Sequence, residues 1–340
     1  MAGKVKVIKA ILTIILVLIL LIAIAIGGLN IYLRTTNGEF FKTNKKEFVI
    51  PGVNEGFVPQ GVAFDENSGY YLVSGYMSDN SASRIYTIDP ATSDFTYVET
   101  VTESGTPETI HAGGIAVYGR YVFVTTGTEK INAYRLAEVT DSDLSSAAPF
   151  ATFTSQNIPE SISVYNDYIY IGEYYEQGTY DTPDNHHFEN EAGEEYNAIA
   201  LIYDITELVR SLSEGNTEAL APVAAYSVTD KAQGFCVLKG GQLAVTTSNK
   251  LKNSTMLIYD DPMKTNLTSD AVFEAANGEK VPLYFLDTES KLKEISLPPM
   301  AEEIMIKGDK VVVMNSFASN RSVFGKLAGA QNCRSFRPDF

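Results

Sequence analysis

The segment QGVAFDENSGYYLVSGY, residues 60–76, contains the pattern that decides the fold. It begins with a polar residue and a glycine and continues as an apolar run. It then turns over residues rich in Asp, Asn and Gly, and returns as a second run of aromatic and β-branched residues. Two strand-forming runs separated by such a turn predict a tight β-hairpin.

The first half of this pattern recurs at four further places in the chain. The five copies are QGVAF (60–64), GGIAV (113–117), ESISV (160–164), QGFCV (233–237) and EEIMI (302–306). A second strand follows each copy, third strands are expected at 84–89, 130–136, 198–205 and 255–260, and fourth strands at 96–101, 149–153, 223–228 and 282–287. Repeated four-stranded units can bury their apolar faces only against one another, which predicts an all-β chain folded as a β-propeller.

Two strand-like segments remain, and they predict how the ring closes. NCRSF (332–336) supplies a third strand to the last unit, and EFVI (47–50) supplies the outermost strand from the N-terminal side, which hides both sheet edges. The prediction is a five-bladed propeller over residues 47–340. The copies are spaced by 53, 47, 73 and 69 residues, so the two longer intervals leave a six-bladed propeller as the alternative. A β-sandwich also has short strands, but it has no reason to repeat one template five times.

The N-terminal region predicts a membrane anchor. Residues 10–29 carry no charged side chain and are long enough, at about 1.5 Å per residue, to cross an apolar core of about 30 Å. Lysines at positions 4, 6 and 9 precede this run, which places the N-terminus in the cytoplasm. We therefore expect a single-pass protein of the cell membrane, with a basic tail (1–9), a transmembrane helix (10–29), a spacer (30–46) and an extracytoplasmic propeller domain (47–340). Cleavage as a signal peptide after Ala23-Ile24-Ala25 is the alternative.

The charge of the chain argues against nucleic acid as a partner. Residues 1–46 carry a net charge of +6, whereas the formal charge of the whole chain is −16, so the remainder carries −22. Such a domain repels phosphates and gains nothing from releasing their counterions. The two cysteines, Cys236 and Cys333, match no metal-ligand spacing, and whether they form a disulfide is left open.

Some of these segments resemble known proteins. At QGVAF and HAGGIAV (111–117) the chain resembles the calcium-dependent lactonase and phosphotriesterase propellers and the repeat propellers of bacterial surface proteins. This resemblance concerns the architecture of residues 47–340. The stretches TPDNHHF (182–188) and FASNRSVFGKL (317–327) resemble a group of exported bacterial propellers, which implies no activity.

The first resemblance also implies a metal site. In the calcium enzymes, acidic and amide side chains at the starts of the inner strands converge on a metal in the central channel. The matching positions here are Gln60, Glu160, Gln233 and Glu302, whose oxygen atoms suit Ca²⁺. The fifth matching position is Gly113, which offers no ligand, although His111 lies two residues earlier on the same strand face.

His111, Glu160 and Glu302 are also the candidate catalytic residues, with His111 as a general base. The alternative is that the two carboxylates only cap turns or bind water at a polar channel entrance.

Residues 174–197 form an unusual insertion between the second and third strands of the third unit. Long loops on a rigid scaffold often form binding lids. This loop is rich in acids, which suits cationic or sugar ligands, and its candidate ligand-binding residues are Tyr174, Tyr175, Tyr180, His186 and His187. The alternative is a solvated excursion whose tyrosines pack on the propeller.

Together these features predict a membrane-anchored binding module for a protein, a wall polymer or a small molecule. The alternative function is a calcium-dependent lactonase or esterase-type hydrolase with its site at the central channel. One propeller fold serves many functions, so the sequence leaves open whether the protein is an enzyme.

Overall fold

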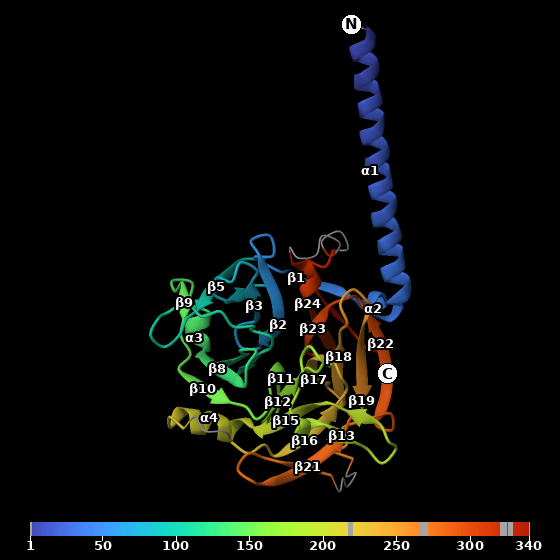
Figure 1. Cartoon of the computed structure of the whole chain (residues 1–340). Helices are drawn as coiled ribbons and strands as arrows, with labels where there is room; N and C mark the ends of the chain where they lie inside the picture. Colours follow the sequence, from blue (N-terminus) through green and yellow to red (C-terminus); the bar gives the residue numbers. More distant parts are fainter. Residues whose placement is uncertain (1, 217–219, 266–270, 320–324, 326–328, 340) are drawn as a thin grey trace.

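The computed structural model describes residues 2–216, 220–265, 271–319, 325 and 329–339. Five sheets, the blades, each built on four antiparallel strands, surround a common axis, and one long helix leaves the ring (Figure 1). The prediction of a five-bladed β-propeller with an apolar N-terminal helix is confirmed.

The blades follow one another along the chain. Blade 1 contains β2 (Phe57–Asp65), β3 (Tyr70–Met77), β4 (Arg84–Ile88) and β5 (Phe95–Thr100), extended by β9 (Ser146–Ala147). Blade 2 contains β6 (Ile115–Tyr118), β7 (Tyr121–Thr125), β8 (Lys130–Arg135) and β10 (Ala151–Thr154), with α3 (Leu136–Val139) after β8. Blade 3 contains β11 (Pro159–Tyr165), β12 (Tyr168–Glu173), β15 (Ala198–Asp204) and β16 (Ala224–Val228), with α4 (Ile205–Ser213) after β15.

The last two blades complete the ring. Blade 4 contains β17 (Ala232–Val237), β18 (Leu243–Thr247), β19 (Ser254–Tyr259) and β22 (Lys291–Leu297). Blade 5 contains β23 (Ala301–Lys307), β24 (Lys310–Asn315), β25 (Asn332–Phe336) and the N-terminal strand β1 (Lys45–Val49). The innermost strands β2, β6, β11, β17 and β23 are the five template copies, and each contacts the next around the axis, with β23 returning to β2.

The apolar core lies between the blades. Five clusters of buried side chains are found among the described residues, and each joins two neighbouring blades. Ile162 and Phe123, for example, belong to the cluster between blades 2 and 3. Each blade therefore buries its faces against its neighbours, as the repeat pattern requires.

The ring is closed by the N-terminal strand, as expected. β1 pairs antiparallel with β25, and Phe48 lies opposite Cys333. The Phe48 ring packs 4.7 Å from the ring of Tyr71 in blade 1, and the Tyr71 hydroxyl donates a hydrogen bond of 2.7 Å to Glu47. Both cysteines are buried and unpaired.

One predicted strand belongs to a different blade. Residues 282–287 were expected as the outer strand of blade 4, but β21 (Lys280–Phe285) pairs in parallel with β16 of blade 3, and β20 (Val272–Glu274) pairs with β21. The outer strand of blade 4 is β22, which pairs with β19. Its sequence, KLKEISL, is rich in charge because an outer strand faces solvent. The segment was not predicted as a strand because of this polarity.

The described residues of the two long intervals between template copies contain no sixth blade. The interval of 73 residues holds the 174–197 loop and α4, and the interval of 69 residues holds the β20–β21 hairpin that extends blade 3. The six-bladed alternative is therefore wrong.

The N-terminal helix α1 (Ala2–Thr36) is longer than the apolar run within it, and the stretch Lys6–Thr36 is long and apolar enough to cross a membrane. Residues 30–46, expected as a spacer, contain the end of α1, all of α2 (Gly38–Thr43) and the start of β1.

This region is docked on the propeller. Leu33, Asn37 and Phe40 are buried, the Ser296 hydroxyl donates to Asn37 at 2.8 Å, and Phe40 packs on Phe336. The foot of the helix therefore has a defined place beside blades 4 and 5.

Candidate functional site at the channel mouth

The template residues lie at irregularities of the inner strands. In β2, β11 and β17 the pairing register shifts at one residue, and those residues are Gln60, Glu160 and Gln233. In β23 the shift covers Glu302 and Glu303. A β-bulge inserts one extra residue and re-aims its side chain. Because each of these four irregularities lies in the first half of an inner strand, these residues gather at one end of the channel, which we call the mouth.

Three of the candidate residues form one electrostatic group at the mouth. The His111 Nε2 atom lies 3.3 Å from the Glu160 Oε1 atom. Glu160 raises and His111 lowers the pKa of Glu302, although burial is the largest influence on it. Blades 2, 3 and 5 therefore bring His111, Glu160 and Glu302 together, as the sequence suggested.

The position of His111 is set by its neighbours. Its backbone N–H donates to the Thr126 carbonyl at 3.0 Å, and a side chain at Gly127, whose φ is +80°, would meet the His111 Cβ atom at 2.6 Å. The Tyr76 ring stacks on the imidazole with centroids 5.2 Å apart. The imidazole is thus held between two segments while 41% of the side chain stays exposed.

Glu302 is the carboxyl group best placed for proton exchange. Its side chain is buried, and burial raises its pKa to about 7 even though the Ser316 hydroxyl donates a hydrogen bond to it. A carboxyl group with a pKa near neutrality can act as a general acid or base at physiological pH.

Tyrosines border the carboxylates. Because β12 runs antiparallel to β11, residues after β12 lie at the end of blade 3 where Glu160 lies. The pKa of Tyr174 is raised first by burial, then by Glu176 and Tyr180, and also by Glu160 and Glu302. The Tyr180 ring meets Tyr174 edge-on at 5.5 Å and is mostly exposed. The base of the loop therefore borders the mouth.

Gln60 and Gln233 do not join the carboxylates by direct contacts. The Gln60 amide donates to the Pro59 carbonyl at 2.8 Å, and within the described part of the chain no hydrogen bond links either glutamine to Glu160 or Glu302. No group of three or more His, Cys, Asp or Glu side chains arranged to hold a metal ion is found there. The calcium site stays a prediction.

The sequence argument missed Glu303, which lies on the channel axis. Its Oε2 atom accepts from the Ile162 amide of blade 3 at 3.3 Å, and a Cβ at Gly114 of blade 2 would come within 2.6 Å of that oxygen. Burial raises its pKa well above the usual range, although the amides of Ile162, Phe235 and Ile115 oppose this.

A comparison of the five template copies contains a signal for Glu303. The second template position is small in four copies, at Gly61, Gly114, Ser161 and Gly234, and is Glu only in the fifth. The small residues let the inner strands approach: a Cβ at Gly61 would meet the Ile115 nitrogen at 2.8 Å. Beyond the mouth the channel is lined by mostly apolar residues of all five inner strands, which enclose about 100 Å³.

The 174–197 loop is held to blade 3 by a buried histidine. His186 is buried, and its Nδ1 atom lies 3.1 Å from both carboxylate oxygens of Glu173, which also accepts from the Ile199 amide at 2.9 Å. A histidine in this position holds the loop to blade 3 and has no surface for a ligand. His187 bonds Thr182 at 2.9 Å and meets Tyr175, which is itself buried.

The acidic part of the loop lies elsewhere. The hairpin of β13 (Phe188–Glu189) and β14 (Glu195–Tyr196) borders a cleft of about 960 Å³ together with the segment after β21. Hydrogen bonds from Thr288, Asn190 and Tyr196 lower the pKa of Glu194 in this cleft to about 2. In Figure 1, β13 and β21 lie on the side of the propeller away from the N-terminus of α1.

No protein-family model and no curated protein matches the sequence. Among solved structures, the PQQ-bound aldose sugar dehydrogenase of Streptomyces coelicolor is 12% identical with a TM-score of 0.45, covering 86% of this chain and 97% of that one. Glutaminyl cyclase of Myxococcus xanthus is 10% identical with a TM-score of 0.42, covering 86% and 92%. Hydrazine synthase of Kuenenia stuttgartiensis is 9% identical with a TM-score of 0.37; the match covers 75% of this chain and 55% of that one.

These similarities carry no functional argument at such identities and TM-scores.

Most of the FASNRSVFGKL stretch lies outside the described residues.

Proposed function

We propose that this protein is a membrane-anchored, extracytoplasmic binding propeller whose channel mouth takes a small organic cation. The observation that carries the proposal is the group of Glu160 and Glu302 bordered by the rings of Tyr76, Tyr174 and Tyr180. Carboxylates together with aromatic faces are the side chains that recognise ammonium groups, and each well-placed ring contributes about 0.5–2 kcal/mol.

The charge balance of the mouth supports a cationic ligand. Within the described residues, no lysine or arginine forms an ion pair with Glu160 or Glu302, and His111 is the one partner of Glu160. Burial, and then the charge of Glu160, raises the pKa of Glu302, and a bound cation would favour the ionised form of this carboxyl group. The net charge of −22 on residues 47–340 would also draw cations towards the domain.

Membrane anchoring rests on the length and apolar composition of α1. The lysines before its apolar run favour an orientation with the propeller outside the cytoplasm.

Calorimetric titration of the full chain in a neutral detergent with choline and with ethanolamine tests the ligand class. We expect saturable binding, weakened about tenfold or more by Glu160→Gln and by Tyr174→Ala. Glu207→Gln, on the exposed surface of α4, is the matched control and should bind like the wild type. Absence of binding for both cations, or equal affinity in Glu160→Gln, would contradict the proposal.

The second candidate is a hydrolase of the lactonase or esterase type, favoured by the pKa of about 7 of Glu302 beside the His111–Glu160 pair. In this candidate Glu302 exchanges the proton and His111 acts as the base. A panel of lactones and esters, assayed with Ca²⁺ and with a chelator, separates the two functions. Turnover that Glu302→Gln abolishes would favour the hydrolase. If the chelator also abolishes turnover, the result would support a calcium site.

A further inference from the structure

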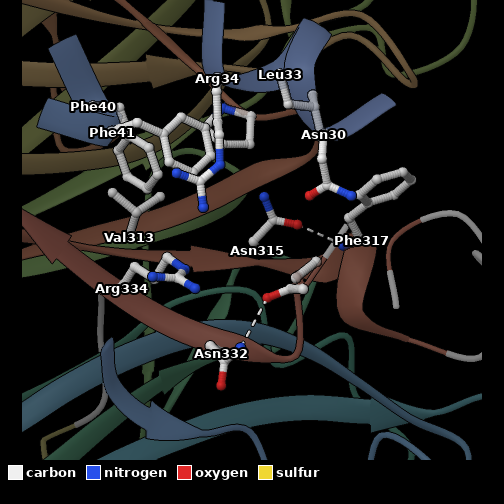
Figure 2. Close-up of a pocket in the computed structure, with 13 residues that line it drawn as sticks. Asn30, Leu33, Arg34, Phe40, Phe41, Val313, Asn315, Phe317, Asn332 and Arg334 are labelled. Carbon is white, nitrogen blue, oxygen red and sulfur yellow. Dashed lines mark hydrogen bonds between the residues drawn. The ribbon is translucent and has the colours of Figure 1, made fainter. Parts of the chain in front are cut away.

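A pocket of about 280 Å³ lies where α1 and α2 meet blade 5. Its walls are partly apolar, from Leu33, Phe40 and Phe41 on the helices and from Val313 and Phe317 on blade 5. Figure 2 shows these side chains around a central opening.

Two arginines face this opening. In Figure 2 the Arg34 guanidinium points from α1 into the pocket, towards Arg334 of β25. No lining residue is acidic, and neither arginine forms an ion pair with a carboxylate in the described part of the chain. Arg334 donates to the Asn44 side chain at 2.8 Å, and Arg34 lies 5.5 Å from the Phe41 ring centre.

The two guanidinium groups are unfavourable neighbours. Burial, and then the charge of Arg34, lower the pKa of Arg334. Like charges held together in a partly apolar pocket favour an anion that bonds both, and guanidinium groups match the oxygen atoms of a phosphate in geometry.

The pocket also has a defined depth relative to a membrane. The apolar run ends at Leu29 and the pocket lining begins at Asn30, so Arg34 lies five residues, or about 7 Å along the axis, beyond the apolar run. The headgroup layer on each side of a bilayer is about 5–7 Å thick. Because the foot of α1 is docked through Leu33 and Asn37, the pocket stays at this level.

We propose that this pocket binds the phosphate of an anionic membrane phospholipid, with Arg34 and Arg334 as its ligands and the apolar walls against the glycerol and the first acyl carbons. The inference rests on the membrane anchoring proposed above and is independent of the ligand at the channel mouth. A lipid bound in this way would join the anchor to blade 5.

Thermal unfolding of the full chain in a neutral detergent tests this inference. We expect phosphatidylglycerol near saturation to raise the melting temperature by about 3 °C. Monogalactosyl diacylglycerol with the same acyl chains, which is neutral and carries no ammonium group, should have little effect. Neither lipid resembles the cations proposed for the mouth, so failure here and failure of the proposed function are distinguishable.

Variants and a soluble probe complete the test. The pair Arg34→Gln and Arg334→Gln should abolish the shift, whereas Arg210→Gln, on exposed α4, should keep it. Native mass spectrometry, which counts retained phosphatidylglycerol, gives a readout independent of the variants' own stability. Equal shifts with both lipids, or an undiminished shift in the double variant, would overturn the inference. An equal shift with glycerol 3-phosphate alone would overturn the lipid as the source of the phosphate.

Discussion

At the scale of single residues, Glu302 and Glu303 are adjacent but their carboxyl groups lie in different surroundings. Glu302 has a hydrogen bond from Ser316 and the charges of Glu160 and His111 beside it. Glu303 reaches the channel axis, and its Oε1 atom has no hydrogen-bond partner among the described residues. The bulge at these residues breaks the alternation of side chains along β23, so the carboxyl groups of Glu302 and Glu303 lie in different surroundings.

The raised pKa of Glu302 predicts a pH dependence of stability. The folded protein holds this proton more tightly than the unfolded chain, so the contribution of Glu302 to the free energy of unfolding should fall as pH rises from about 4.5 to about 7 and then level off. Glu303, whose pKa is also raised by burial, adds a fall of its own. The full difference between these values corresponds to about 3 kcal/mol. Glu302→Gln should make the fall in stability shallower in that window, leaving the part due to Glu303, when urea unfolding is followed from pH 4 to pH 8.

Two further variants check the cause of this dependence. The Ser316 hydrogen bond lowers the pKa of Glu302, so Ser316→Ala should move the profile to higher pH. Glu207→Gln, on the surface, should leave it unchanged. A wild-type slope that persists in Glu302→Gln would assign the proton to another group, with Glu303 the first to examine.

At the scale of elements, the 174–197 loop is held in place by one of its two neighbouring histidines. His186→Ala would leave the buried Glu173 carboxylate without its imidazole partner, which should cost about 2–4 kcal/mol. The loop contains many glutamates, so a glutamate-specific protease should cut it faster in this variant.

His187→Ala is the matched control, because the hydrogen bond of this half-buried histidine among the described residues is to a threonine hydroxyl, and its loss should cost about 1 kcal/mol or less. Equal stability and equal cleavage rates in the two variants would show that the Glu173–His186 contact does not anchor the loop.

At the scale of the whole molecule, β1 connects the first and last parts of the chain. It covers the edge of β25, buries Phe48 against Tyr71 of blade 1, and places the half-buried Glu47 within hydrogen-bond distance of the Tyr71 hydroxyl. A chain that starts at residue 38 keeps this strand, whereas one that starts at residue 51 leaves the edge of β25 open.

We expect the longer of these two chains to unfold cooperatively and the shorter one to melt at least about 10 °C lower, or to aggregate, because the lost strand removes a buried aromatic side chain and a row of backbone hydrogen bonds. Circular dichroism melts of both chains measure this. Equal melting temperatures would mean that the ring does not depend on β1.

The alternation of apolar residues in five template copies was enough to predict the inner strands, because a local pattern with a period of two determines which faces a strand can bury. It left five and six blades open, and the closing strand was predicted from a leftover strand-like segment. The alternation was not enough for the outer strands. KLKEISL is polar on the solvent side, and PLYFLD reads equally well as an edge strand of either neighbouring blade. The different roles of the adjacent histidines could not be predicted either, since only packing distinguishes the buried His186 from His187.

The sequence alone predicted the propeller and its long apolar N-terminal helix, and a family resemblance nominated Glu160, Glu302 and His111 as site residues at the channel. Only the tertiary structure decided that Glu303 occupies the axis, that His186 is an anchor and that Arg34 and Arg334 meet across a pocket. The physical reason is that strand periodicity is a local property, whereas these contacts depend on tertiary packing. Glu303 reaches across the channel to blade 3, Arg34 and Arg334 come from opposite ends of the chain, and His186 folds back from the loop onto Glu173.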